Sequence, residues 1–148
     1  MNDVLPDEDN VVRYVRPGLV DDGTVDGSAF VLRPGEEALS VNWLECFEGT
    51  VSEQVDQVRA HVHLNLRPNG VLARLNVGDG KTAASSGPEG TGIEFASDPQ
   101  PANPPDYPDP DPSHALVSGL PSGESSAAAA IGDRIRNALT DIHPATVG

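Results

Sequence analysis

The stretch VDGSAFVLRPGEEALSVNWLECF, residues 25–47, holds the chain's only Trp, its only Cys and two of its three Phe. In its second half Leu39, Val41 and Trp43 alternate with other residues, a period of two that indicates a strand with one apolar face. The run SAFVLR, residues 28–33, predicts another strand, and PGEEA between the two predicts a turn. The stretch therefore predicts a β-hairpin whose inner face includes Trp43.

Outward from this stretch, the sequence predicts further short strands and two helices. Strands are expected at residues 11–15, 71–77, 92–97 and 114–120. The first helix should begin at Thr50, because Thr50 and Glu53 fit a capping box. The second is expected over residues 125–141, capped by Ser125 or Ser126. This order predicts an α+β fold, a small antiparallel or mixed sheet with two helices packed on one face.

Length and composition predict a single domain over residues 1–148. Residues 1–10 are acidic, and we expect a flexible N-terminus there. Residues 98–112 contain seven Pro in fifteen positions, which excludes a helix or a central strand. We expect a Pro-rich loop at 98–112 that is ordered only if Tyr107 anchors it.

The charge balance is strongly acidic, with 23 acidic residues, 9 basic residues and a net charge of −14. Such a charge favours solubility, or an acidic face that docks on a basic protein partner. It disfavours direct binding to nucleic acid, which requires cations to neutralise phosphates. The N-terminus has no signal-peptide pattern, and no stretch approaches the ~18 apolar residues of a membrane span. We therefore expect a cytoplasmic protein without membrane association.

Two ligand-binding motifs are incomplete, so no cofactor is predicted. The run VGDGKT, residues 77–82, ends like a phosphate-binding loop, but Leu75 stands where that loop needs Gly. The residues that follow do not predict a helix either, so a glycine-rich loop is expected. DGTVDG, beginning at Asp22, copies the first half of a calcium loop, but Arg33 occupies the position of the bidentate Glu.

The His residues and Cys46 are the remaining candidates for chemistry. His61 and His63 form an HxH pair of the kind found in metal sites, although a helix C-terminus explains them as well. Cys46 could act as a nucleophile with His114 as its base, or it could be a small buried apolar residue. These four residues are therefore weak candidates, for metal binding (His61, His63) and for catalysis (Cys46, His114).

The segments VDGSAF, LSVNWLE and DPSHALVSGLP resemble an uncharacterised family of small bacterial proteins, and the resemblance implies no activity. We expect a non-catalytic interaction module or accessory subunit of a bacterial system, with Asp26, Arg33 and Trp43 as partner-binding residues. One alternative is a small hydrolase-type or metal-dependent enzyme that uses Cys46 and the His residues above. A second alternative is an acidic inhibitor of a nucleic-acid-binding protein.

Overall fold

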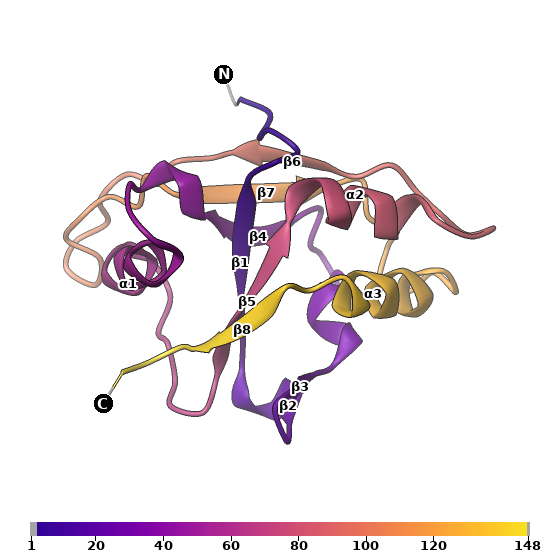
Figure 1. Cartoon of the computed structure of the whole chain (residues 1–148), viewed down its shortest axis with the longest axis horizontal. Helices are drawn as coiled ribbons and strands as arrows, with labels where there is room; N and C mark the ends of the chain where they lie inside the picture. The colour runs from indigo at the N-terminus through magenta and orange to yellow at the C-terminus, as the bar shows by residue number, and fades with distance from the viewer. Residues whose placement is uncertain (1–2, 148) are drawn as a thin grey trace.

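The computed structural model describes residues 3–147, and its centre is a six-stranded antiparallel sheet in the order β6-β7-β4-β1-β5-β8 (Figure 1). A separate two-stranded ribbon carries a turn at Asp22 and Gly23, whose positive φ angles fit the Asp-Gly pair. The sheet strands are β1 (Asn10–Val15), β4 (Leu39–Trp43), β5 (Val71–Asn76), β6 (Glu94–Ser97), β7 (His114–Ser118) and β8 (Asp141–Pro144), and the ribbon strands are β2 (Val20–Asp21) and β3 (Thr24–Val25).

Within residues 3–147, three α-helices flank the sheet, which confirms the α+β class. They are α1 (Val51–His61), α2 (Val77–Ser85) and α3 (Ala128–Asn137), and three short 3-10 helices are η1 (Pro17–Leu19), η2 (Gly27–Phe30) and η3 (Leu44–Cys46). Figure 1 shows α1 on one side of β1 and β5, with α2 and α3 on the other side. The expectation of two helices packed on one face is therefore not confirmed.

The hydrophobic core is correspondingly divided into two clusters. Val11 of β1 belongs to the larger cluster, together with Ile131 of α3. Its neighbour Val12 belongs to the smaller cluster, together with Val58 of α1. Because successive side chains of a strand point to opposite faces, β1 contributes to both clusters and is buried on both sides.

The predicted hairpin over residues 25–47 is wrong. β4 pairs with β1 and β7, whereas the first half of the stretch forms η2. Asp26 caps η2, since its carboxylate accepts a 2.8 Å hydrogen bond from the backbone N–H of Ser28. Gly27 and Gly132 let η2 and α3 approach closely, and this packing buries Phe30. The Asp26 cap makes η2 locally possible, and the close contact with α3 favours it over the strand that the apolar run suggested.

Two expectations about the helices also need correction, although α1 has the capping box predicted at Thr50. Residues 77–85 form α2 rather than a glycine-rich loop, because Asn76 caps the helix through a 2.9 Å bond from the backbone N–H of Asp79. The last helix ends at Asn137, and residues 141–144 form β8 against β5 instead. Ile142 thus lies opposite Ala73 in the sheet.

The sheet divides between β1 and β4, and this division creates the candidate site. The two strands pair only through Val11 with Trp43 and Val12 with Asn42. β1 nevertheless continues to Val15, and β4 already begins at Leu39. Figure 1 shows the two strands running in clearly different directions. The space between them is therefore available to side chains rather than to main-chain pairing.

Candidate functional site

A hollow of about 570 Å³ lies where β1 and β4 separate. Its wall comes from β1, residues 16–19, residues 28–36, β4, the segment after α1, Gln100 and the start of β7. A cavity of this size is in the range of small-molecule sites. Its charged and imidazole-bearing lining residues are Arg13, Arg16, Arg33, Glu36, His63 and His114.

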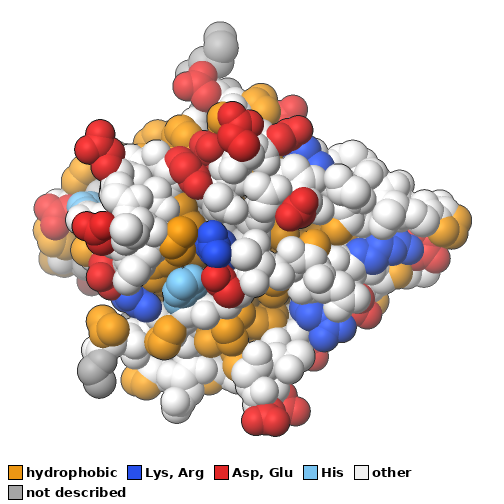
Figure 2. Space-filling model, viewed as in Figure 1, with side chains coloured by type: hydrophobic (Ala, Val, Ile, Leu, Met, Phe, Trp, Pro, Cys, Tyr) orange, Lys and Arg blue, Asp and Glu red, His pale blue; other side chains and the backbone are white. Residues whose placement is uncertain are grey.

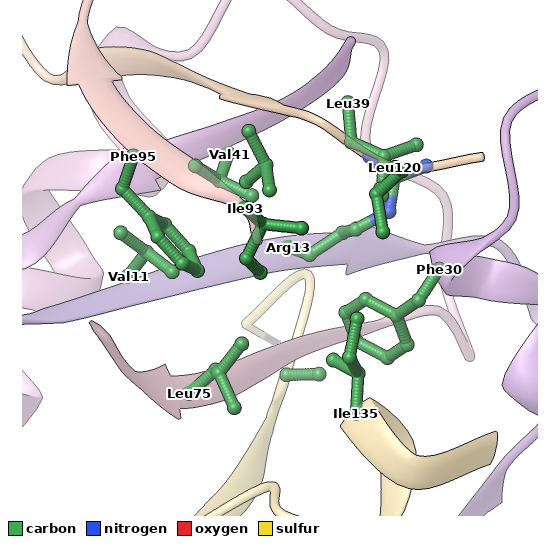
Figure 3. A pocket seen from close by; sticks show the side chains of 12 residues that line it. Val11, Arg13, Phe30, Leu39, Val41, Leu75, Ile93, Phe95, Leu120 and Ile135 are labelled. Carbon is green, nitrogen blue, oxygen red and sulfur yellow. The ribbon is translucent and has the colours of Figure 1, made fainter. Parts of the chain in front are cut away.

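Arg13 is the innermost cation of the hollow. Figure 3 shows its side chain extending from β1 toward Leu39 and Leu120, so that the methylene groups lie in the apolar core. Its Nη1 donates a 2.8 Å hydrogen bond to the carbonyl of Ser40, and its Nε donates to the carbonyl of Ala29. The guanidinium therefore joins β1 to β4 and η2 where the strands no longer pair.

The pKa of Arg13 falls to about 10, mainly because burial disfavours the charged form; the negative charge of Glu36 opposes this shift, and the positive charge of Arg33 adds to it. Arg13 therefore remains a cation at neutral pH. Its third nitrogen, Nη2, has no hydrogen-bond partner within residues 3–147 and is not among the buried unpaired atoms of that range. It is consequently a positively charged donor that retains solvent contact.

Arg33 and Glu36 form an ion pair at the rim, with 3.1 Å between Nη2 and Oε2. The hydrogen bond from Arg33 holds the pKa of Glu36 below its ordinary value, and the same bond raises that of Arg33. The Arg33 side chain is 77% exposed, so the pair contributes little to stability. Arg33 is thus a cation of the rim that already has a bonded carboxylate.

A buried polar network fixes the Pro-rich loop beside the hollow. Asp111 and Ser113 are fully buried, and Asn42 is nearly so. The Asp111 carboxylate accepts hydrogen bonds from the Asn42 amide at 2.9 Å, the Ser113 hydroxyl at 2.7 Å and the Ser113 backbone N–H at 3.0 Å. Because a buried carboxylate needs such donors, this network ties the end of the loop to β4.

The middle of the loop is anchored by aromatic stacking. Tyr107 stacks on the ring of His63 with 4.8 Å between the ring centroids. The Nε2 atom of His63 also lies 2.7 Å from the carbonyl oxygen of Asp109. Tyr107 therefore anchors residues 98–112, as expected from the sequence for an ordered loop.

The structure does not join the catalytic and metal-binding candidates into one centre. His114 bonds to Asp98 and Gln100, whereas His61 bonds to the Gln57 carbonyl of its own helix. No hydrogen bond within residues 3–147 links Cys46 to an imidazole. Burial raises the pKa of the Cys46 thiol, and the negative charge of Asp111 raises it further. No group of three or more His, Cys, Asp or Glu side chains in this range could hold a metal ion.

The three partner-binding candidates occupy separate places. Trp43 is half-buried, and its Nε1 donates a 2.8 Å hydrogen bond to the Asp9 carboxylate. Arg33 precedes β4 and lies at the rim of the hollow, whereas Trp43 ends that strand. Asp26 caps η2, and the hydrogen bond from Ser28 lowers its pKa.

Sequence reasoning missed Arg13, although a signal was available. Val11, Arg13 and Val15 alternate along β1, and both Val residues are buried in the larger cluster. A period-two pattern therefore placed a cation on an inward face, where an unpaired charge is costly. Such a position indicates either a close partner or a ligand.

A second surface feature is an acidic end beside the N-terminal segment, where Figure 2 shows acidic side chains gathered. The Asp7 carbonyl accepts from the Gly78 N–H, and Glu45 accepts two hydrogen bonds from Asn10, so these segments lie together. Lys81 pairs with Asp7 at 2.8 Å. We define the acidic end as Asp7, Glu8, Asp9, Glu45 and Asp79.

The helical backbone of residues 78–81 also bears on the phosphate-loop motif. Gly78 and Gly80 lie inside α2, and Lys81 is engaged with Asp7, so these residues do not form a loop around an anion.

In the part of the chain that the structure describes, no helix has the length and apolar character needed to cross a bilayer. Comparison with protein-family models, curated proteins and solved structures gives no match.

Proposed function

We propose that this protein is a non-catalytic, cytoplasmic interaction module whose acidic end docks on a basic surface of a protein partner. The observation that carries the proposal is the local charge of that end, five carboxylates with Lys81 as the paired cation. Glu8 and Asp79 are exposed and have no hydrogen-bonded cation within residues 3–147. Uncompensated charge of one sign attracts a partner of the opposite sign and accelerates association.

The hydrogen bonds of the imidazoles and the surroundings of the Cys46 thiol support a binding role rather than catalysis. His63, His114 and Cys46 hold or adjoin the Pro-rich loop, and burial disfavours the thiolate form of Cys46. A thiol nucleophile normally requires the opposite shift, toward a lower pKa. The two imidazoles act here as structural anchors of the loop.

Cross-linking in cells can test the docking surface directly. A photo-crosslinking amino acid at Glu8 should capture one protein with a basic surface, whereas the same group at Asp22 on the ribbon should not. Binding of that purified partner is then measured by calorimetry. No specific capture at Glu8, or equal capture at both positions, would contradict the proposal.

The matched variants are Glu8→Gln with Asp79→Asn at the acidic end, and Asp21→Asn with Asp22→Asn on the ribbon. Each pair removes two charges, and Asn tolerates the positive φ of Asp22. The acidic-end pair should weaken binding about fivefold at low salt, from roughly 0.5 kcal/mol per exposed charge pair. The effect should fade at high salt because of screening. Equal affinities of the two double variants would exclude this end as the interface.

Inhibition of a nucleic-acid-binding protein is the second candidate function. It is favoured by the way the acidic end is held: the Asp7 and Asp9 carbonyls accept from the backbone N–H groups of Gly78 and Val77. Fixed carboxylates can occupy a phosphate-binding surface better than mobile ones. This function predicts that duplex DNA or RNA displaces the captured partner, and coexistence of both ligands on that partner would oppose it.

A further inference from the structure

The hollow between β1 and β4 concentrates cations in an otherwise acidic protein. Three of the nine basic residues line it, and Glu36 is the carboxylate among its lining residues. His63 and His114 also lie in its wall. In a chain of net charge −14 this distribution creates a local positive field, which favours anions.

The innermost cation is already oriented. Two of the three guanidinium nitrogens of Arg13 donate to backbone carbonyls, which fixes the plane of the group. Those acceptors are neutral, so the charge of Arg13 has no directly bonded anion within residues 3–147. The remaining nitrogen, Nη2, is the donor left to a ligand, and a charge-assisted bond to an anion is about twice as strong as a neutral one.

We propose that this hollow binds a small organic carboxylate with an apolar body, its carboxylate group on Arg13 and its body against the aliphatic wall. This site is distinct from the acidic end and does not depend on the proposed docking function. The aliphatic wall consists of Leu19, Val31, Leu32, Pro34, Val62 and Leu64. The hollow thus places charged and polar side chains beside an apolar wall, and small-molecule sites likewise combine polar groups that fix orientation with apolar surface.

The charge of the ligand follows from the pairing at the rim. Glu36 compensates Arg33, so Arg13 and Arg16 are the cations that remain for the ligand. Arg16 is exposed and its guanidinium lies over Gly18, at the edge of the hollow. Solvent screens the charge of the exposed Arg16, so the buried Arg13 is the main cation for the ligand, and one such cation suits a single negative charge better than the double charge of a phosphate.

An NMR titration of the whole chain tests this site. Phenylacetate and hexanoate serve as probes, and phenylacetamide, hexanamide and inorganic phosphate serve as comparisons. The two acids should give saturable shifts at the backbone amides of residues 28–36 and at the Arg13 Nε–H. The neutral amides should bind at least tenfold more weakly, because they lack the charge that Arg13 receives.

Variants of Arg16 and Arg33 at the rim of the hollow should not disturb folding, because both side chains are exposed. Arg16→Gln should weaken phenylacetate binding about fivefold, whereas Lys81→Gln, which removes the same charge beside the acidic end, should leave it unchanged. Arg33→Gln should weaken binding at least as much as Arg16→Gln, since it also leaves the Glu36 carboxylate without its partner, and that negative charge repels the anionic probe. Arg13→Lys keeps the charge but loses the fixed fork, and it should weaken binding more than tenfold if its spectrum remains folded.

Three results would overturn the proposal. The first is equal binding of phenylacetate and phenylacetamide, which would make the hollow a purely apolar site. The second is tighter binding of inorganic phosphate than of either acid, which would assign the hollow to a compact anion. The third is a shift pattern that does not saturate or that responds equally to Lys81→Gln and Arg16→Gln.

Discussion

The buried carboxylate of Asp111 offers the sharpest test of how the loop beside the hollow is held. In Asp111→Ala, the Ser113 backbone N–H and hydroxyl lose their acceptor, while the Asn42 amide keeps one bond to the Ser113 hydroxyl at 2.8 Å. A buried donor left unpaired costs about 1–3 kcal/mol. With two donors affected, the free energy of unfolding should fall by about 2–6 kcal/mol, a large part of the ~5–15 kcal/mol of a typical domain.

Urea unfolding followed by the fluorescence of Trp43, the only Trp, measures this loss. Asp106→Ala is the matched control, because Asp106 lies in the same loop with its side chain exposed, and it should change stability by less than about 0.5 kcal/mol. Asp111→Asn should cost less than Asp111→Ala, since one amide oxygen can still accept from Ser113. If Asp111→Ala unfolded at the same urea concentration as Asp106→Ala, the network would not be what holds the loop.

Three further predictions concern the reactivity of Cys46, the acid stability of the Arg74–Asp141 pair and the packing of Gly132. The Cys46 thiol should react with iodoacetamide more slowly at pH 8 than a small-molecule thiol, because burial raises its pKa. Arg74 lowers the pKa of Asp141 from its ordinary 3.8, so this pair stabilises the fold above about pH 4 and loses its contribution as the pH falls further; Arg74→Gln should flatten the acid-unfolding curve there. Gly132→Ala places a Cβ 2.6 Å from the Gly27 carbonyl oxygen, and urea unfolding should show a loss of about 1–2 kcal/mol.

The elements that could be predicted from the sequence are those whose signals are local. α1 begins where Thr50 and Glu53 form the capping box, and the turn before β5 has Asn69 in the left-handed region with Gly70 bonded back to Arg67. Each of these features lies within four residues. The residues that form the capping box and the turn are neighbours in sequence, so the sequence pattern alone is enough to predict both.

The errors arise where distant contacts decide between two local possibilities. Gly78 and Gly80 disfavour a helix, yet an ideal Cβ at Gly80 would lie 2.9 Å from the Leu75 side chain and 3.1 Å from that of Phe95. The missing side chain at Gly80 thus lets α2 pack against the sheet, and tertiary packing overrides propensity. η2 formed in place of a strand for the same reason, through its close contact with α3.

The polar network could not be predicted, because its members are far apart in sequence. Asn42 and Asp111 are separated by 69 residues, and nothing in either neighbourhood indicates the other. Asp111 resembles the other acidic residues of a Pro-rich segment until the fold places it beside β4. Burial of one carboxylate among many exposed ones is a property of the tertiary structure alone.

Arg13 connects the fold to the proposed site. A cation at an inward position of a strand must either find acceptors or reach water, because burying it alone is costly. The separation of β1 from β4 provides both: the carbonyls of Ser40 and Ala29 become available to its guanidinium, and the hollow leaves Nη2 in contact with solvent. Continued pairing of the two strands would have closed the hollow and occupied the Ser40 carbonyl. The feature that makes Arg13 tolerable in the core is therefore the same one that makes it accessible to an anion.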